Sequence, residues 1–443
     1  MSNHLLDLLT ASHFNKDSVV LRFANGSFWT RQQLFDRAAR YASVLHNLGL
    51  KAGDRVCLQV EKSVETVALT LGAIQVGVIF NPLNTAYTTA EISYFIGDAE
   101  PRLLVCDPTK RDALSLAAEK AGVAHVETLG ADGQGSLASL VDLAQPMIDA
   151  IPRGPDDIAA ILYTSGTTGR SKGAMLSHDN LGSNALTLKD YWQFTDRDVL
   201  LHALPIYHTH GLFVAINTIL VCGGSMIFLP KFDPKQILSL MPNATCLMGV
   251  PTFYTRLLQQ QGLTTETTKH MRLFISGSAP LLAETHREWQ ARTGHAILER
   301  YGMTETNMNT SNPYTGERIA GTVGFPLPNV SVRVTDPETG ALLEQADSIG
   351  MLEVKGPNVF KGYWRMPEKT ISEFRADGYF MTGDLGKIDH KGYVHIVGRG
   401  KDLIISGGFN VYPKEVETEI DSMTGVVESA VVGVPHPDFG EGV

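Results

Sequence analysis

The segment 161–173, Ile-Leu-Tyr-Thr-Ser-Gly-Thr-Thr-Gly-Arg-Ser-Lys-Gly, limits what this chain can fold into more than any other stretch. Its first three residues are apolar, as is typical of the end of a buried strand. A loop rich in glycines and hydroxyls follows, with two cations, Arg170 and Lys172, directly behind it. Glycines let backbone N–H groups approach an anion, and hydroxyls add further donors. The segment therefore predicts a strand followed by a polyphosphate-binding loop.

Two known motifs could be compared with this loop, the Walker A motif and the nucleophile elbow of serine hydrolases. The Walker A pattern Gly-x-x-x-x-Gly-Lys-Ser/Thr does not fit the sequence. Residues 169–173 match the Gly-x-Ser-x-Gly elbow of serine hydrolases, which needs a helix directly after the serine. The residues that follow Ser171, 174–176, are predicted to be extended. A hydrolase nucleophile at Ser171 is therefore a distant alternative.

The pattern Tyr-Thr-Ser-Gly-Thr-Thr-Gly-x-x-Lys-Gly at 163–173 resembles the phosphate loop of the acyl-adenylate-forming superfamily. That superfamily contains acyl-CoA synthetases, firefly luciferase and the adenylation domains of peptide synthetases. The resemblance implies that ATP phosphates are bound by Thr164, Ser165, Gly166, Thr167, Thr168, Gly169 and Lys172. It also implies a Mg²⁺ ion, with Thr168 as one of its ligands.

Composition excludes several other classes of protein. A formal net charge of −10, without a basic run, argues against a nucleic-acid-binding protein. The four cysteines are far apart and form no Cys-x-x-Cys motif, which fits a reducing cytoplasm. The N-terminus lacks the features of a signal peptide, so a cytoplasmic enzyme is expected. The most apolar stretch, 212–229, is interrupted by polar residues and glycines, so we expect a core helix (212–221) and a strand (225–229) and no membrane span.

Strands and helices alternate through most of the chain, which favours an α/β fold with parallel, doubly wound sheets. Capping boxes predict helices that begin after Thr30 and Thr88. From Arg318 onward, short runs with frequent glycines predict a β-rich subdomain. We expect a large adenylate-forming domain at 1–398 with two doubly wound sheet subdomains and this β-rich part, a hinge at 399–401, and a small, incomplete α+β domain at 402–443.

Two further motifs strengthen the resemblance. The first is Tyr301-Gly-Met-Thr-Glu-Thr306. By resemblance, Tyr301 stacks on adenine, Thr304 contacts the α-phosphate and Glu305 helps to hold Mg²⁺. The second is Tyr379-Phe-Met-Thr-Gly-Asp384, whose aspartate would accept hydrogen bonds from the ribose. The resemblance further assigns to the nucleotide Ser278, Ala279, Glu299, Arg300, Gly302, Met303 and Arg399.

The resemblance continues toward the C-terminus. Lys401 corresponds to the family's hinge, and Gly407 and Gly408 to the loop that crosses the CoA channel. A helix at 414–422 and a strand at 429–434 are expected. The family's Pro-x-x-x-x-Gly-Lys segment, whose lysine assists adenylation, is absent from the 443 residues. We therefore interpret the chain as a truncated form with impaired adenylation.

The acid pocket is predicted from three segments. The segment 202–214 contains three histidines without a nearby carboxylate or cysteine, so a metal site is not favoured. By resemblance this segment lines the acyl pocket, with His208 as a catalytic or substrate-binding residue; a structural histidine is the alternative. Ser276, Gly277 and Met303 are expected to contact the acyl group.

Arg256 follows the segment Met-Gly-Val-Pro-Thr-Phe-Tyr-Thr, which resembles a wall of the acyl pocket. A guanidinium there would hold the second carboxylate of a dicarboxylic acid, whereas a surface arginine on an amphipathic helix is the alternative. The segments Pro-Ile-Tyr-His-Thr-His-Gly-Leu, Tyr-Gly-Met-Thr-Glu-Thr-Asn-Met-Asn-Thr-Ser and Phe-Lys-Gly-Tyr-Trp-Arg-Met-Pro carry a finer resemblance to bacterial malonyl-CoA synthetases.

The resemblance thus implies a ligase that joins malonate, or a close relative such as methylmalonate, to coenzyme A through an acyl-AMP intermediate, with ATP and Mg²⁺. Lys172, Thr304, Glu305 and His208 would be its catalytic residues. An enzyme that adenylates another small acid or loads a carrier protein is the main alternative. A nucleotide-binding module without catalysis is another. The expected partners are small molecules only, and the sequence does not give an oligomeric state.

Overall fold

The computed structural model describes residues 2–11, 15–164, 170–406, 409–421, 423, 425–426, 428–437 and 440–443. Two groups of predicted site residues lie outside this part of the chain. They are Ser165–Gly169 of the phosphate loop and the pair Gly407–Gly408.

The first sheet has the strand order β6-β5-β3-β4-β7-β8. Its strands are β3 (Arg55–Gln59), β4 (Ile79–Pro82), β5 (Leu103–Cys106), β6 (His125–Thr128), β7 (Ile158–Thr164) and β8 (Lys172–Ser177). Neighbouring strands are parallel, except for the antiparallel pair β7 and β8. The helices along this part of the chain are α1 (His4–Thr10), α2 (Arg31–Asn47), α3 (Val64–Gln75), α4 (Thr89–Ala99), α5 (Arg111–Lys120) and α6 (Ser136–Leu143).

The second sheet has the order β15-β14-β13-β12-β11-β9-β10-β1-β2 and is parallel from β13 to β1. Its strands are β1 (Val19–Arg22), β2 (Phe28–Thr30), β9 (Val199–His202), β10 (Ser225–Phe228), β11 (Cys246–Gly249), β12 (Leu273–Ser276), β13 (Leu298–Met303), β14 (Asn307–Ser311) and β15 (Phe325–Pro326). Its helices are α7 (His178–Tyr191), α8 (Thr218–Cys222), α9 (Pro234–Leu240), α10 (Pro251–Leu258), α11 (Thr265–Thr268) and α12 (Ala283–Thr293).

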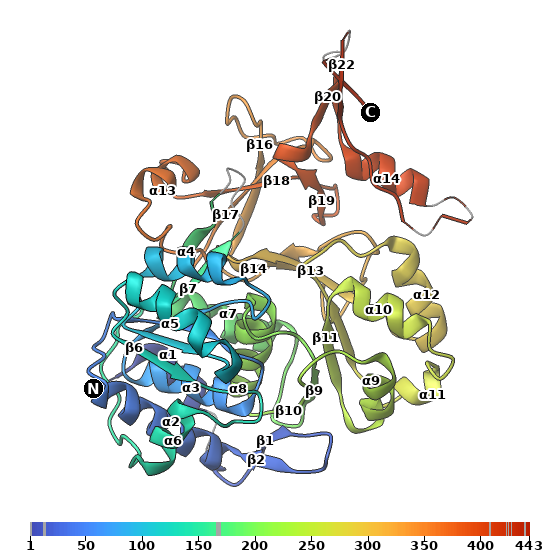
Figure 1. Ribbon diagram of the computed structural model, residues 1–443. Helices are drawn as coiled ribbons and strands as arrows, with labels where there is room; N and C mark the ends of the chain where they lie inside the picture. Colours follow the sequence, from blue (N-terminus) through green and yellow to red (C-terminus); the bar gives the residue numbers. More distant parts are fainter. Residues whose placement is uncertain are drawn as a thin grey trace.

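Two antiparallel sheets complete the fold. The third contains β16 (Ser331–Thr335), β17 (Gly350–Lys355), β18 (Phe380–Ile388) and β19 (Val394–Arg399), with α13 (Pro367–Glu373) beside it. The fourth contains β20 (Ile404–Ser406), β21 (Phe409–Val411), β22 (Val434–His436) and β23 (Gly440–Gly442), and α14 (Pro413–Asp421) belongs to the same part of the chain. In Figure 1 these two sheets lie above the two larger ones, and the C-terminus lies at the top.

Local sequence signals account for much of this architecture. The Thr30 and Thr88 capping boxes form as predicted, each with its reciprocal side-chain and backbone hydrogen bonds. They satisfy N–H groups that a helix start otherwise leaves without a partner. The alternation of strands and helices gives the predicted α/β fold, and the β-rich part begins after Arg318. Across the described residues, no helix is long and apolar enough to span a membrane.

Two predicted elements differ from the structure. The helix predicted at 212–221 begins as a π-helix, η2 (His210–Asn217), before α8 continues it. The strand predicted at 429–434 is wrong, because only Val434–His436 pairs in the fourth sheet. Ahead of it, the Val431 N–H donates to Glu417 Oε1 at 3.1 Å, so this backbone bonds to α14 and not to a neighbouring strand.

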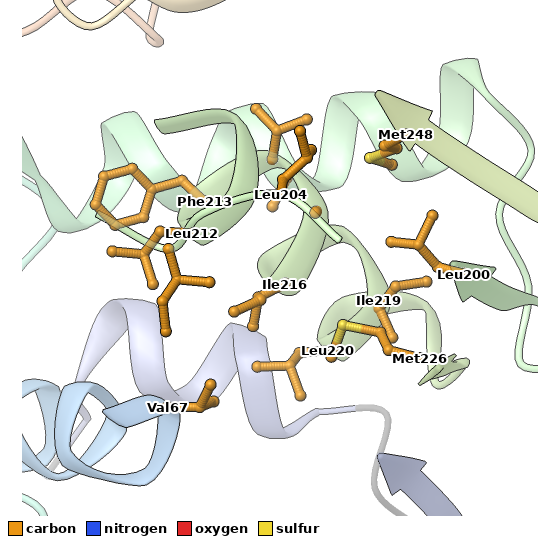
Figure 2. Close-up of a cluster of buried hydrophobic side chains, with 14 of the residues drawn as sticks. Val67, Leu200, Leu204, Leu212, Phe213, Ile216, Ile219, Leu220, Met226 and Met248 are labelled. Carbon is orange, nitrogen blue, oxygen red and sulfur yellow. The ribbon is translucent and has the colours of Figure 1, made fainter. Parts of the chain in front are cut away.

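A large hydrophobic core joins the first two sheets. Figure 2 shows η2 and α8 at its centre. Ile216 and Ile219 lie there among side chains from α3, β9 and β11, and these side chains are almost completely buried: Val67, Leu200 and Met248. Since η2 begins at His210, this packing fixes the end of the segment predicted to line the acid pocket.

Candidate active site

Strand β13 carries the central residues of the candidate site. Successive side chains of a strand point to opposite faces, so Arg300 and Tyr301 reach different neighbours. A register shift follows between Tyr301 and Gly302. A Cβ on Gly302 would lie 1.8 Å from the carbonyl oxygen of Asn307, so this position requires glycine. The bulge leads directly into Thr304 and Glu305.

Tyr301 belongs to a cluster with Asp384 and Arg399. Its hydroxyl donates to Asp384 Oδ2, and Arg399 Nε lies 2.8 Å from Asp384 Oδ1. Asp384 and Arg399 face each other across β18 and β19. Burial raises the pKa of Asp384, while Arg399 and Tyr301 oppose that rise. The structure therefore brings together three residues predicted to hold adenine and ribose.

The stems of the predicted phosphate loop meet a second cluster. The antiparallel ladder between β7 and β8 pairs Thr164 with Lys172, the described residues on the two sides of the predicted loop. Thr164 Oγ1 donates to Glu305 Oε1 at 3.3 Å. Lys172 Nζ lies 3.1 Å from Glu373 Oε1. The Tyr363 hydroxyl lies 3.1 Å from Glu305 Oε1 and 2.7 Å from Glu373 Oε2, so it links the two carboxyl groups.

Glu305 has the environment of a carboxylate that binds a cation. Its side chain is buried, and burial raises its pKa. Within the described residues, Lys172 pairs with Glu373 and no basic side chain forms an ion pair with Glu305. That part of the chain also holds no group of three metal-binding side chains. The donor set fits Mg²⁺, which typically uses one or two carboxylates together with phosphate oxygens and water.

Arg300 forms the third cluster, with Gly277 and Ser278. It is only 3% exposed, and its Nη2 donates to Ser278 Oγ at 3.4 Å. Its Nε has no hydrogen-bond partner in the described structure, and no described carboxylate pairs with the guanidinium. A Cβ on Gly277 would lie 2.4 Å from Arg300 Cζ, so glycine makes room for the guanidinium. Burial lowers the pKa of Arg300 to about 9. A buried, unpaired cation is costly, and an anionic ligand would offset that cost.

Two histidines border the same cluster. His210 Nδ1 lies 3.4 Å from Ser278 Oγ, and its Nε2 has no partner among the described residues. Burial and the nearby charge of Arg300 lower the pKa of His210 well below its usual value, so the ring is neutral near pH 7. His208 is exposed, and its Nδ1 accepts the His210 backbone N–H at 3.3 Å.

Lys62 stabilises the loop that carries these histidines. This buried lysine donates to the carbonyl oxygens of His202 and Leu204, at 2.8 and 3.0 Å. His202 Nε2 in turn lies 3.0 Å from the carbonyl oxygen of Gly211, at the start of η2. The contact joins the segment after β3 to the segment after β9, so both large sheets fix the position of His208 and His210.

A family model described as AMP-binding enzyme matches residues 10–364. The chain belongs to the AMP-binding enzyme family. It is 34% identical to a malonate–CoA ligase of Arabidopsis thaliana, across 89% of this chain and 68% of that protein. It is also 34% identical to a feruloyl-CoA synthase of Amycolatopsis, across 94% of this chain and 82% of that protein. ATP-bound MatB from Rhodopseudomonas palustris is 66% identical, with a TM-score of 0.97 over 100% of this chain and 88% of the MatB chain.

The distant hydrolase alternative is wrong, because the predicted elbow is not formed. Ser171 is followed directly by strand β8 and not by a helix. Its carbonyl oxygen accepts a hydrogen bond from the Tyr94 hydroxyl at 2.7 Å, which holds the loop stem against α4. The extended residues after Ser171 were the feature that argued against this alternative in the sequence.

Arg256 is exposed on α10, whose buried face includes Phe253, Tyr254 and Leu257. The surface-arginine alternative therefore fits the structure, and the buried guanidinium at the site is that of Arg300. Arg272 is also buried in part, but Asp198 neutralises it through two hydrogen bonds of 2.7 and 2.8 Å.

The other predicted residues lie around these clusters. Ser276 is buried at the end of β12, Ala279 and Lys401 are exposed, and Met303 and Thr304 are partly exposed at the end of β13. Glu299 faces away from them, because His286 Nδ1 and the Gly321 N–H bind its carboxylate at 3.1 and 3.3 Å.

Sequence reasoning missed His210, Tyr363 and Glu373. His210 belongs to the predicted histidine segment, but the resemblance pointed to His208. Tyr363 stands in the Phe-Lys-Gly-Tyr-Trp-Arg-Met-Pro segment, in which the residue types alone indicate no chemical role. Glu373 has no motif around it, and only the fold brings it to Lys172.

Proposed function

We propose that the chain is an ATP-dependent ligase that joins malonate, or a close dicarboxylic acid such as methylmalonate, to coenzyme A. The malonate carboxylate would attack the α-phosphate of ATP to give malonyl-AMP and pyrophosphate. The CoA thiol would then attack the acyl carbonyl and release AMP. Membership of the AMP-binding enzyme family and likeness to a malonate–CoA ligase support this reaction.

The choice of a dicarboxylic acid rests on Arg300. Relatives of equal identity act on different acids by name, malonate in one case and ferulate in another, so identity alone does not choose between them. A buried guanidinium beside Ser278 and His210 supports malonate, because an apolar acid would leave this guanidinium unpaired. A second carboxylate would pair with it through two hydrogen bonds.

The nucleotide would lie across the first two clusters. We propose that Tyr301 stacks on adenine, that Asp384 accepts the ribose hydroxyls, and that Arg399 lies beside the ribose and phosphate. The neutral amide and hydroxyl donors of Thr164–Gly169, with Lys172, would hold the polyphosphate. Thr304 would contact the α-phosphate at the end of β13.

Glu305 is the proposed protein carboxylate for Mg²⁺, with Thr168 as the second candidate ligand. When bound, the ion would neutralise phosphate charge and polarise the phosphorus under attack. The chain's own residues position the two reactants: Arg300 holds the far carboxylate, so the near one is directed toward the α-phosphate. Such alignment of two bound reactants is a large part of catalysis in a reaction of this kind.

Thioester formation is assigned to the C-terminal part. We propose that residues 402–443 belong to a small domain that moves about a hinge at 399–401 relative to a large domain at 1–398. Lys401 would be the hinge residue, and Gly407 and Gly408 would border the CoA channel. We further propose that a polypeptide limited to these 443 residues adenylates slowly.

A cytoplasmic enzyme is the proposed setting. Cys57, Cys106, Cys222 and Cys246 are all free and buried thiols, which supports a reducing compartment.

The test is a panel of small acids assayed in the protein expressed from its complete natural reading frame. Acid-dependent exchange of pyrophosphate into ATP should be fastest with malonate or methylmalonate and slow with acetate, butyrate and ferulate. Malonyl-CoA should form with free CoA. Adenylation without malonyl-CoA would point to a carrier-protein acceptor, and no preference for a dicarboxylate would overturn the proposed substrate class.

A further inference from the structure

The segment Phe360–Pro367 continues the first sheet beyond β8. Lys361 N donates to the carbonyl of Met175 at 2.9 Å, Met175 N donates to Gly362 at 2.9 Å, and Trp364 N donates to Gly173 at 2.7 Å. Tyr363 therefore lies opposite Ala174, two residues from Lys172. This pairing fixes the backbone of Tyr363 beside the stem of the predicted phosphate loop.

The conformation of the segment is specified closely. Gly362 has a φ of +121°, and a Cβ there would lie 2.6 Å from Thr370 Cγ2. The Tyr363 N–H donates to Thr370 Oγ1 at 2.9 Å, which ties it to α13. Since α13 also carries Glu373, the same helix supports both the backbone of Tyr363 and the carboxylate beside its hydroxyl.

The Tyr363 side chain has two separate contacts, one for each end. Its ring lies under Lys172, with Nζ 4.1 Å from the ring centroid. Its hydroxyl bridges Glu305 Oε1 at 3.1 Å and Glu373 Oε2 at 2.7 Å. Only 2% of the residue is exposed, so water does not replace these partners easily. One side chain thus touches the proposed phosphate-binding lysine and the proposed Mg²⁺-binding carboxylate.

We propose that Tyr363 is a positioning residue of the ATP and Mg²⁺ site. Its hydroxyl orients the Glu305 carboxylate, and its ring holds the Lys172 ammonium beside the loop. This proposal rests on the proposed function for the identity of the two groups that it positions. The two ends act separately, because phenylalanine keeps the ring and removes only the hydroxyl.

The alternative is that Tyr363 only stabilises the fold, and it predicts a different result. Tyr41 on α2 offers a matched control away from the site, because its buried hydroxyl also donates to a carboxylate, that of Glu65 on α3, at 2.6 Å. Loss of either hydroxyl should lower the thermal midpoint by a few degrees. Only loss of the Tyr363 hydroxyl should change the response to Mg²⁺.

The experiment is calorimetric titration of the 443-residue chain with ATP over a series of Mg²⁺ concentrations. Tyr363→Phe should raise the Mg²⁺ concentration needed for half of the maximal gain in ATP affinity by about tenfold, with metal-free ATP affinity changed by less than about threefold. Tyr363→Leu should in addition weaken metal-free ATP binding by about tenfold, because Lys172 loses its support. Glu305→Gln should remove most of the gain, and Tyr41→Phe should leave both quantities unchanged.

Each outcome bears on one proposal. If Tyr363→Phe matches wild type, or if Mg²⁺ does not strengthen ATP binding in wild type, the positioning role is overturned. If the binding data follow the expected pattern while the complete protein forms no acyl-CoA from any acid, the ligase proposal fails and the role of Tyr363 stands.

Discussion

Arg300 and Tyr301 are neighbours in the sequence, yet they belong to different parts of the proposed reaction. The alternation of side chains along β13 sends Tyr301 to Asp384 and Arg300 to Ser278. One strand would therefore set the distance between the proposed nucleotide and acid sites. A residue inserted into β13 before Arg300 would turn the side chains of Arg300 and Tyr301 to the opposite faces of the sheet. Their position along the strand is therefore as important as the residue types.

The unpaired state of Arg300 makes a prediction that combines stability and specificity. Arg300→Met removes a buried cation that no described carboxylate neutralises. The unfolding free energy of the ligand-free protein should therefore rise by roughly 1–3 kcal/mol, and its thermal midpoint should rise with it. The ratio of kcat/KM for malonate to that for butyrate should fall by about a hundredfold, because the second carboxylate loses its partner.

Unfolding scans and pyrophosphate exchange in the complete protein measure the two effects. Arg256→Ala, which removes an exposed arginine, is the control and should change neither. A variant with lower stability and an unchanged ratio would show that Arg300 serves the fold and not the substrate.

At the scale of elements, the contact between α1 and α7 should be sensitive to pH. The Leu5 N–H of α1 donates to Nδ1 of His178, the first residue of α7, at 3.3 Å, and this acceptor exists only while Nδ1 is unprotonated. Burial, with the nearby charge of Arg153, lowers the pKa of His178 to about 4 from 6.5. Asp157 opposes that shift and His4 adds to it.

The sign of the effect follows from the two pKa values. Between pH 6.5 and about 4 the unfolded chain binds a proton at His178 that the folded chain does not, so stability falls as the pH falls through this window. The full loss is about 3 kcal/mol, at about 1.4 kcal/mol per pH unit. His178→Gln should be less stable than wild type at pH 7 and should lose less stability on acidification. Denaturant unfolding at pH 7 and pH 4.5 measures both, and equal losses in the two proteins would contradict the assignment.

Elements whose signals are local could be predicted from the sequence, and contacts made by the fold could not. The capping boxes at Thr30 and Thr88 involve residues three positions apart, so the sequence contains the whole interaction. The pairing of Asp384 with Arg399, by contrast, was anticipated only through family motifs. Arg256 was chosen for the acid pocket because it follows a pocket-like segment, but the 3.6-residue period of α10 turns it to solvent. The resemblance assigns Arg300 to the nucleotide, whereas its burial and its lack of a described carboxylate partner are visible only in three dimensions.

At the scale of the whole molecule, different sheets contribute different residues of the candidate site. The hairpin of β7 and β8 belongs to the first sheet, β12 and β13 to the second, and β18 and β19 to the third. The Tyr301 cluster joins the second and third sheets, and the Glu305 cluster joins the first sheet to the residues after β13. The Arg300 cluster is built by the second sheet alone, so the candidate site as a whole needs three sheets. The residues proposed for nucleotide binding all precede residue 400, whereas the proposed CoA channel lies in the fourth sheet's part of the chain.

This division predicts that nucleotide binding and adenylation can be separated. A polypeptide limited to these 443 residues keeps the contacts among Tyr301, Asp384 and Arg399, so it should bind ATP and AMP. It contains no lysine in a Pro-x-x-x-x-Gly-Lys setting. Loss of a cation placed at a developing phosphoryl charge commonly costs a hundredfold or more, roughly 3 kcal/mol. Malonate-dependent pyrophosphate exchange should accordingly be at least about a hundredfold slower than in a polypeptide extended by a C-terminal segment that carries such a lysine.

Calorimetry measures ATP binding in both proteins, and exchange kinetics measure adenylation. Synthetic malonyl-AMP provides the internal control. Supplying the adenylate bypasses the step that needs the lysine, so the 443-residue polypeptide should form malonyl-CoA from it more readily than from malonate and ATP. Full exchange activity in this polypeptide would show that the lysine is dispensable here. Failure to bind ATP would show that the first three sheets do not make a self-sufficient nucleotide site.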